Sequence, residues 1–438
     1  MRIFMGLTEI AGNYAYLARG FLANGVEAEI ANFFGDKFGY PAPRSRHASL
    51  RFASYFGQRR RLATGRAQRA FWVMMLLPLR LWILVWACTR FDVFIFGFGT
   101  SFFSYLELPL LKWLGKTIIV QFHGSDIRPP FIDGAMLPLF KSNKDQLKRI
   151  RELSHRRRVL ERYADVVIAP VTCAQFLNRK IVDPVFLGKP VDVTESRFEV
   201  ERRAPHEGDG MVRVMHAPSQ LAAKGTLEIR QVIDDLVALG LPIDYVEISN
   251  ATNAKVMDEL SSADILIDQL YSDIVMPSLA KEAAVLGVPV IVSGYYSEVF
   301  DQEPFCRYTP PVVVCLPDAL AETLETLVND REKRLRAGMA LRNFVRTEWT
   351  AERVAARYLQ VIRQVAPQEW FVDPASFPYL KGCALSEEAA KKNVSRLIAS
   401  AGVGSLQLDH KPRLRDRFVA WSLSPPPRDA GGNGVPPR

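Results

Sequence analysis

Residues 212–239 read "VRVMHAPSQLAAKGTLEIRQVIDDLVAL". This stretch begins with a short apolar run, passes through a loop that carries Lys224 and Gly225, and ends in a segment with helical periodicity. A strand that leads through a loop into a helix presents free backbone N–H groups and the positive end of the helix dipole. A lysine there adds a mobile positive charge. The stretch therefore predicts a strand–loop–helix unit of an α/β fold, with a phosphate site in its loop.

The same alternation of strands and helices runs through most of the chain. Apolar runs at 91–98, 116–123 and 165–170 are typical of buried parallel strands, and the second half repeats the pattern. The sequence thus predicts two doubly wound α/β domains with a ligand cleft at the carboxyl ends of their strands. We expect a first domain over 1–194, a linker over 195–210, a second domain over 211–348, a helix over 349–365, and a helical or irregular extension over 366–438 whose last ~15 residues are disordered.

The overall composition narrows the class of protein. The five cysteines are scattered and form no C-x-x-C pair, which favours a reducing, cytoplasmic location and argues against a zinc site. The chain has no P-loop, no G-x-G-x-x-G motif and no cluster of metal ligands, so we expect neither a metal nor a cofactor. The net charge is +9, but the stretch from Lys37 to Arg90 alone carries eleven Lys and Arg and no acid. Positive charge confined to one region indicates an anionic surface or ligand rather than nucleic acid.

A second marker is "AKEAAVLGVPVIVSG" at 280–294. It predicts a helix that carries Glu282 near its start and ends at Gly287, followed by a buried strand. A carboxylate near a helix N-terminus can serve only as a partner of the helix dipole. It can also accept two hydrogen bonds from a vicinal diol such as a ribose. Together with Lys224 it would supply the two parts of a nucleotide diphosphate site.

These residues resemble a known family. "HAPS", "KGT", "ILIDQLY" and "KEAAVLGVPVI" look like the donor-binding domain of retaining glycosyltransferases with the GT-B fold, of the glycosyltransferase family 4 type. "LELPLLKWLGKTIIVQFHGSDIR" at 106–128 resembles the stretch ending in "HGSD" in bacterial polysaccharide-assembly members. The resemblance covers about residues 1–365. It implies two Rossmann-like domains facing across a cleft and a helix over 349–365 that crosses back to the first domain.

The resemblance also implies an activity and a set of site residues. The activity is transfer of a sugar from a nucleotide diphosphate sugar to a glycan or lipid-linked glycan, with retention of configuration and without a bound metal. Lys224 would neutralise the donor diphosphate, Glu282 would hold the ribose, and the backbone amides of the turn at 12–13 would approach the sugar phosphate. The implied catalytic residues are His123, Asp126 and Lys224, and the implied donor-binding residues are Gly12, Asn13, Ser219, Lys224, Gly225, Asp268, Gln269 and Glu282.

Several of these residues have a structural alternative. Asp126 would equally cap the turn before Pro129, and Asp268 and Gln269 are either structural partners of the loop or donor-site residues. His216 is expected to be structural.

The sequence departs from the family pattern at four points. The position of the first donor-site glutamate is Ile274, with Asp273 one place out of register. No arginine precedes Lys224 in its loop, the N-terminal turn has one glycine where two are common, and "SDIVMPS" replaces a glycine-containing segment. Two alternatives therefore stay open: a catalytically degenerate scaffold subunit of a glycan-assembly complex, and a nucleotide-sugar epimerase.

The segment "RRRLATGRAQRAFWVMMLLPLRLWILVWAC" at 59–88 places five arginines before an 18-residue apolar run. Eighteen residues is near the minimum for a membrane span. Pro78 and Arg80 interrupt the run, and the strands predicted on either side of it should pair in one sheet, which a single crossing would prevent. We therefore expect the segment to lie in the interface of an anionic membrane, on the inner face of the cytoplasmic membrane; the alternative is a buried helix of the first domain. The tryptophans expected at headgroup depth are Trp72, Trp82 and Trp86.

Overall fold

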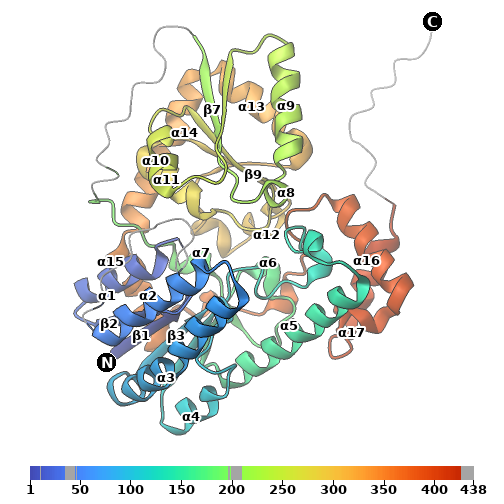
Figure 1. The fold of residues 1–438 in the computed structure, drawn as a ribbon. Coiled ribbons are helices and arrows are strands. Elements are labelled where there is room, and N and C mark those ends of the chain that lie inside the picture. Colours follow the sequence, from blue (N-terminus) through green and yellow to red (C-terminus); the bar gives the residue numbers. More distant parts are fainter. Residues whose placement is uncertain (10, 35–44, 46, 196–197, 199–209, 426–438) are drawn as a thin grey trace, which may run out of the picture.

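The chain folds into two α/β domains, each built on its own sheet (Figure 1). A computed structural model describes residues 1–9, 11–34, 45, 47–195, 198 and 210–425. The two doubly wound domains predicted from the sequence are confirmed. Most of the predicted linker over 195–210, and residues 426–438 at the end expected to be disordered, lie outside the described residues.

The first domain contains a seven-stranded sheet in the order β12-β6-β5-β4-β3-β1-β2. All neighbours pair in parallel except β12 and β6. The predicted pairing of the first strand with the strand at 91–98 is confirmed, because Ile3 lies opposite Val93. The strands are β1 (Arg2–Leu7), β2 (Glu27–Asn32), β3 (Val93–Gly97), β4 (Thr117–Gln121), β5 (Val166–Ile168), β6 (Ile181–Val182) and β12 (Phe371–Val372).

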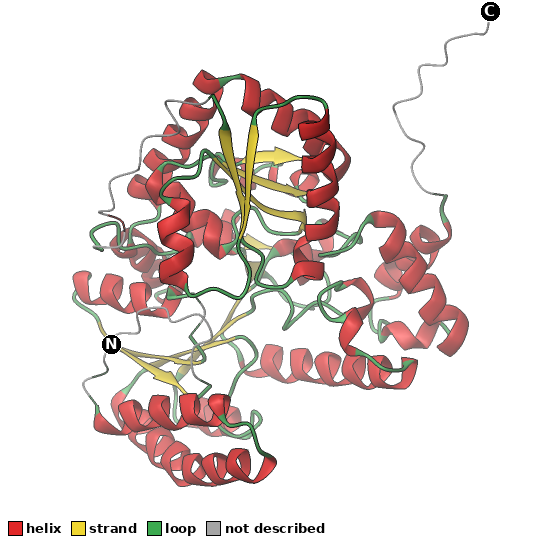
Figure 2. Ribbon diagram, turned by 45° about the horizontal axis from the view of Figure 1, so that its top comes forward, coloured by secondary structure: helices red, strands yellow, loops and turns green. Residues whose placement is uncertain are grey.

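Helices connect these strands and cover the sheet (Figure 2). The long basic helix α5 begins after an N-cap at Ser142, whose side chain accepts the N–H of Asp145. The helices of this domain are α1 (Asn13–Ala23), α2 (Ala48–Leu62), α3 (Arg66–Arg90), α4 (Glu107–Trp113), α5 (Asn143–Tyr163), α6 (Val171–Ala174) and α7 (Pro184–Leu187).

The second domain contains a five-stranded parallel sheet in the order β11-β10-β9-β7-β8. Helices cover both faces of this sheet, and a central strand such as β10 is buried along its whole length. The strands are β7 (Val212–His216), β8 (Ile243–Glu247), β9 (Ile265–Ser272), β10 (Val290–Gly294) and β11 (Val313–Cys315). The helices are α8 (Leu221–Lys224), α9 (Thr226–Ala238), α10 (Asn253–Leu260), α11 (Ser278–Leu286), α12 (Ser297–Phe300), α13 (Leu320–Asn329) and α14 (Arg331–Glu348).

The chain then returns to the first domain. Helix α15 (Ala351–Ile362) packs on α1, where a Cβ on Gly20 would lie 1.9 Å from the carbonyl oxygen of Ala351. Beyond it the chain adds β12 to the edge of the first sheet, followed by α16 (Glu387–Ala401) and α17 (Pro412–Leu423). These two helices lie beside α5 (Figure 1), and their apolar side chains form a separate small core with Phe131 and Phe176. The extension is therefore part of the first domain.

Aromatic packing fixes the two domains against each other. Phe186 of α7 lies 5.2 Å from the ring of Phe305, which follows α12 in the second domain, and 5.2 Å from the ring of Tyr308. Trp370, beside β12, stacks on Phe186 with the two ring centres 6.2 Å apart. Stacked and edge-to-face ring pairs at these distances add to the burial of the rings themselves.

Helix α3 corrects part of the prediction for 59–88. By length and composition α3 could cross a membrane. Only 22% of its most apolar window is buried, so α3 is not a helix of the protein core. Trp82 faces outward and is 64% exposed. Trp72 instead packs against Phe56 of α2 at 5.5 Å, and Trp86 packs against Phe91 at 5.1 Å. Trp72 and Trp86 are thus half-buried against neighbouring aromatic rings, and Trp82 is the most exposed of the three tryptophans.

Candidate active site

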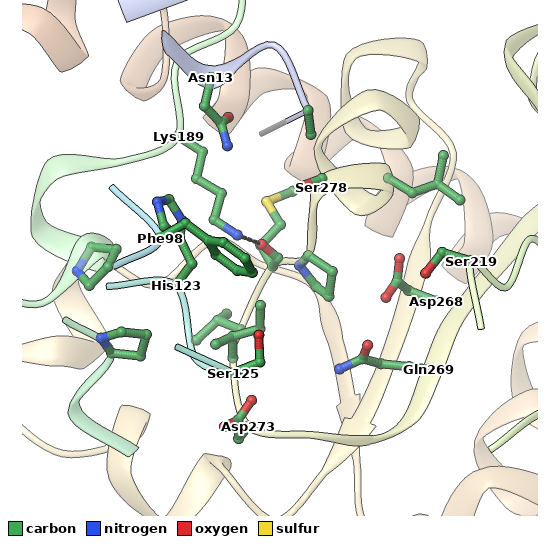
Figure 3. Close-up of a pocket in the computed structure, with 18 of the residues that line it drawn as sticks. Asn13, Phe98, His123, Ser125, Lys189, Ser219, Asp268, Gln269, Asp273 and Ser278 are labelled. Carbon is green, nitrogen blue, oxygen red and sulfur yellow. Dashed lines mark hydrogen bonds between the residues drawn. The ribbon is translucent and has the colours of Figure 1, made fainter. Parts of the chain in front are cut away.

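A cleft of about 970 Å³ separates the two domains at the carboxyl ends of their strands (Figure 3). The first domain contributes the loop after β1, the loop after β4 and the segment after α7. The second domain contributes the loop after β7, the end of β9 and the start of α11. Of the residues implied by the resemblance, the cleft is lined by Asn13, His123, Ser219, Lys224, Asp268 and Gln269.

Lys224 is the last residue of α8, in the connection between β7 and α9. Its Nζ donates to Asp268 Oδ2 at 2.7 Å and to Gln269 Oε1 at 2.8 Å. The side chain of Asp268 is only 1% exposed and that of Lys224 is 16% exposed. Asp268 and Gln269 are therefore structural partners that hold the lysine, and both side chains also line the cleft.

The backbone around Lys224 explains the glycine that follows it. Gly225 has φ 68° and joins α8 to α9, and a Cβ there would lie 2.7 Å from the Cβ of Leu270. A side chain at this position is therefore excluded both by backbone conformation and by space. Gly225 places the loop against β9 and does not itself line the cleft.

His216 is structural, as expected. It is fully buried, with Nδ1 2.8 Å from the carbonyl oxygen of Ile267 and Nε2 3.0 Å from Thr226 Oγ1. Burial lowers the pKa of its imidazole. A neutral ring with both nitrogens engaged joins β7 to β9 and to the start of α9.

Glu282 lies deeper than the sequence predicts. It is 1% exposed, and its carboxylate accepts hydrogen bonds from Asn253 Nδ2 at 3.1 Å and 3.3 Å. Asn253, at the start of α10, lines the cleft, whereas Glu282 does not. The amide of Asn253 therefore covers the carboxylate that we expected to meet a ribose.

His123 and Asp126 lie in the loop after β4 and have different surroundings. Asp126 Oδ1 accepts the backbone N–H of His123 at 2.8 Å, so the carboxylate closes this turn and does not line the cleft. Burial raises the pKa of Asp126 to about 6. His123 lines the cleft, and burial together with the charge of Lys189 lowers its pKa to about 4, so its imidazole is neutral at pH 7.

The turn after β1 leads directly into α1. Gly12 has φ 73° and precedes α1, and Asn13 Oδ1 accepts from Lys281 Nζ of α11 at 3.1 Å. The amides of the first turn of α1 are already bonded, because the carboxylate of Glu9 accepts the N–H groups of Tyr14 at 3.1 Å and Ala15 at 3.0 Å. These two amides are therefore not available to a sugar phosphate.

A buried ion pair across the cleft was not foreseen. Arg128, which follows "HGSD" and is 4% exposed, pairs with Asp133 of its own domain at 2.9 Å and with Asp273 of the second domain. Thr172 Oγ1 also donates to the carbonyl oxygen of Asp273 at 2.7 Å. Asp273 stands one place from the expected first glutamate, and here it ties the domains together. The sequence signal was an arginine directly after the motif, but only the fold shows its partner.

Among the described residues no group of three or more His, Cys, Asp or Glu side chains could hold a metal ion.

No family model matches this sequence, and the comparison with curated proteins found no match. The catalytic domain of starch synthase IV from Arabidopsis thaliana, solved with ADP and acarbose, is 12% identical with a TM-score of 0.51, covering 83% of this chain and 99% of that chain. A glycosyltransferase from Rickettsia africae is 12% identical with a TM-score of 0.47, covering 83% and 98%, and HepE of Anabaena, solved with UDP and glucose, is 11% identical with a TM-score of 0.46, covering 83% and 99%. The similarity to the starch synthase shows the fold, which is the two-domain GT-B fold.

Proposed function

We propose that this protein is a glycosyltransferase that moves a sugar from a nucleotide diphosphate sugar to an acceptor hydroxyl, with retention of configuration. The observation that carries the proposal is the position of Lys224. Its ammonium stands at a strand–loop–helix junction inside the cleft, held at 2.7 Å and 2.8 Å by two acceptors. Such a junction suits a phosphate, and a lysine fixed there meets the group on which charge develops.

The chemistry needs little from the protein beyond electrostatics. The bond between the anomeric carbon and the phosphate oxygen breaks, and a bond to the acceptor oxygen forms on the same face of the sugar. The leaving diphosphate takes the proton of the acceptor hydroxyl, so no separate base is required. Lys224 would stabilise the growing negative charge of the leaving group. The neutral imidazole of His123 would contact the sugar from the opposite wall of the cleft.

A binding subunit without catalysis is the second candidate. It is favoured by the bonds that already engage Glu282, which was expected at the ribose, and two further groups beside the predicted site. Glu282 is covered by Asn253, the first-turn amides of α1 are bound by Glu9, and Asp273 is held by Arg128. A chain that has lost turnover would retain a cleft of this kind and still bind a nucleotide.

The test of donor use is thermal stabilisation by sugar nucleotides. We would screen the diphosphate sugars of uridine, guanosine and adenosine, the last because the starch synthase domain was solved with ADP. A ligand at 100 times its Kd stabilises the native state by about 2.7 kcal/mol. We expect one of these series to raise the unfolding temperature. If none does so at millimolar concentration, donor use is refuted.

We also propose that the acceptor is presented at an anionic membrane, to which α2, α3 and α4 bind. The outward face of α3 exposes Met74, Leu81 and Trp82, each by more than half, and α4 is flanked by Leu106 and Trp113, exposed by 80% and 81%. We interpret these exposed apolar side chains as one interaction surface. Burial raises the pKa of the half-buried Cys88 thiol at the end of α3, and the charges of Glu107, at the start of α4, and of Lys116, just beyond α4, also act on it, so the end of α3 lies beside α4.

The charge on this face favours a lipid bilayer. Helices α2 and α3 contain no Asp or Glu, and five arginines lie between 59 and 69. Arg61 also lines the cleft, so the basic face and the mouth of the cleft meet at α2. A membrane bound here would bring a lipid-linked acceptor to the site.

Liposome flotation tests this surface. We expect binding to rise with the fraction of anionic lipid and to weaken when Arg59, Arg60 and Arg61 become Gln, each contributing about 1 kcal/mol. The control replaces three exposed basic residues of α5, Lys144, Lys148 and Arg151, by Gln and should leave binding unchanged. Equal loss in both variants would indicate general charge attraction, and no binding of the wild type at low salt would contradict the proposal.

A further inference from the structure

A second lysine points into the cleft at a place that the motifs did not single out. Lys189 follows α7 and lines the cavity, and Figure 3 shows its side chain directed to the centre of the site, between His123 and Asp268. Its Nζ donates to the carbonyl oxygen of Met276, which lies two residues before the start of α11. Ser278, the first residue of that helix, also lines the cleft.

The backbone that carries Lys189 is held on both sides. Before it, the buried carboxylate of Asp183 accepts the N–H groups of Val185 at 2.7 Å and of Val171 at 2.6 Å, which fixes the start of α7. Directly before the lysine, Gly188 packs so tightly on Trp349 that a Cβ would lie 2.6 Å from its ring. After it, Val191 bonds to the backbone of Trp349 at 3.0 Å. The side chain therefore extends from a rigid segment of the first domain.

The two cleft lysines differ in their partners. Lys224 already has a carboxylate at 2.7 Å. Of the residues that the structure describes, none places a carboxylate within 4.0 Å of the Nζ of Lys189, whose bond is to a neutral carbonyl. Burial and the charge of Lys224 lower the pKa of Lys189 to about 8, against the attraction of Asp268 and Asp183. A half-buried ammonium without a counter-ion is costly, and an anionic ligand would remove that cost.

The charge of a diphosphate calls for a second cation. The loop after β7 supplies only Lys224, whose ammonium is partly neutralised by Asp268, and it contains no arginine. The geometry points to Lys189 as this cation: we propose that its ammonium binds the diphosphate of the donor from the first domain, opposite Lys224. The inference rests on the proposed use of a nucleotide diphosphate sugar. It adds that the donor joins both domains through a pair of lysines.

The test compares nucleoside diphosphates with nucleosides. Calorimetry would measure the Kd of UDP, GDP and ADP and of uridine, guanosine and adenosine for the wild type, Lys189→Met and Lys189→Gln. The matched control is Lys180→Met, an exposed lysine of the same domain that lies outside the cleft. We expect both substitutions of Lys189 to raise the Kd of the preferred nucleoside diphosphate about tenfold and to leave the Kd of its nucleoside unchanged. Lys180→Met should change neither Kd.

The outcomes separate this inference from the function on which it rests. If no nucleoside diphosphate binds the wild type, the proposed function and the assignment of Lys189 are both refuted. If the diphosphate binds and Lys224→Met weakens it, while folded Lys189→Met and Lys189→Gln retain the wild-type Kd, only the assignment of Lys189 is wrong. If the nucleoside loses affinity in parallel with the diphosphate, Lys189 shapes the cleft and does not bind phosphate, which also overturns the inference.

Discussion

The substitution Lys224→Met separates the structural role of this lysine from its proposed chemical role. It removes the ammonium and leaves the carboxylate of Asp268, 1% exposed, without its ion-pair partner. Removing one partner of a buried pair destabilises a protein by about 3 kcal/mol. The single variant would therefore lose activity for two reasons at once, and its kinetics alone would not identify the cause.

The double variant Lys224→Met, Asp268→Asn resolves this. An asparagine in place of Asp268 has nearly the same shape and no charge, so it no longer requires a cation. We expect the free energy of unfolding of the double variant to return to within about 1 kcal/mol of the wild type. The catalytic loss should stay, because the charge of Lys224 then no longer meets the leaving diphosphate. Loss of one preorganised stabilising group lowers kcat by about 10²–10³.

The assay pairs urea unfolding with steady-state turnover of the preferred donor. Wild type, both single variants and the double variant form a cycle, and circular dichroism confirms that each is folded at the assay temperature. Wild-type kcat in a stable double variant would refute the role of Lys224. A defect confined to the donor KM would show that the lysine binds the ground state and transition state equally.

Three further predictions follow from the contacts. Glu282→Ala removes the acceptor that orients the Asn253 amide at the wall of the cleft, so it should weaken UDP binding no more than Asn253→Ala does; a larger calorimetric loss for Glu282→Ala would mean that its carboxylate itself reaches the ribose. Burial lowers the pKa of Lys189 from 10.5 to about 8, so between these pH values the unfolded chain binds more protons than the folded protein. The free energy of unfolding should therefore increase as the pH rises from 8 to 10. Urea titrations at pH 8 and pH 10 should show this increase in the wild type and not in Lys189→Met. Asp273→Asn should weaken the tie to Arg128 and raise the ligand-free radius of gyration in X-ray scattering, whereas Asp133→Asn, which alters a pair within one domain, should not.

Much of the fold could be predicted because each element has a local signal. The strands are short apolar runs, the helices have amphipathic periodicity, and Gly225 and Gly287 stand where the chain needs a left-handed conformation. The path of the chain beyond 365 had no such signal. The two-residue strand β12 is too short to show a period, and its partner β6 is equally short.

The site was only partly predictable for a different reason. The loop of Lys224 was identified from its own sequence, and the structure places it in the cleft. The pair between Arg128 and Asp273 joins residues far apart in the chain, so no local pattern reveals it. The hydrogen bond from Asn253 to Glu282 likewise joins two different helices, α10 and α11. Motifs identify which residues can act, while burial decides which of them reach the cleft.

Product analysis tests most directly whether this chain transfers a sugar. The purified protein would be incubated with its preferred sugar nucleotide, with and without a lipid-linked glycan acceptor in anionic vesicles. Mass spectrometry would then follow the acceptor, and NMR would follow the anomeric configuration. We predict that the acceptor gains one sugar with the configuration that it had in the donor, and that the nucleoside diphosphate is released in equal amount. Donor binding with no product would contradict it in favour of a binding subunit, and an altered sugar on the nucleotide without acceptor would contradict it in favour of an epimerase.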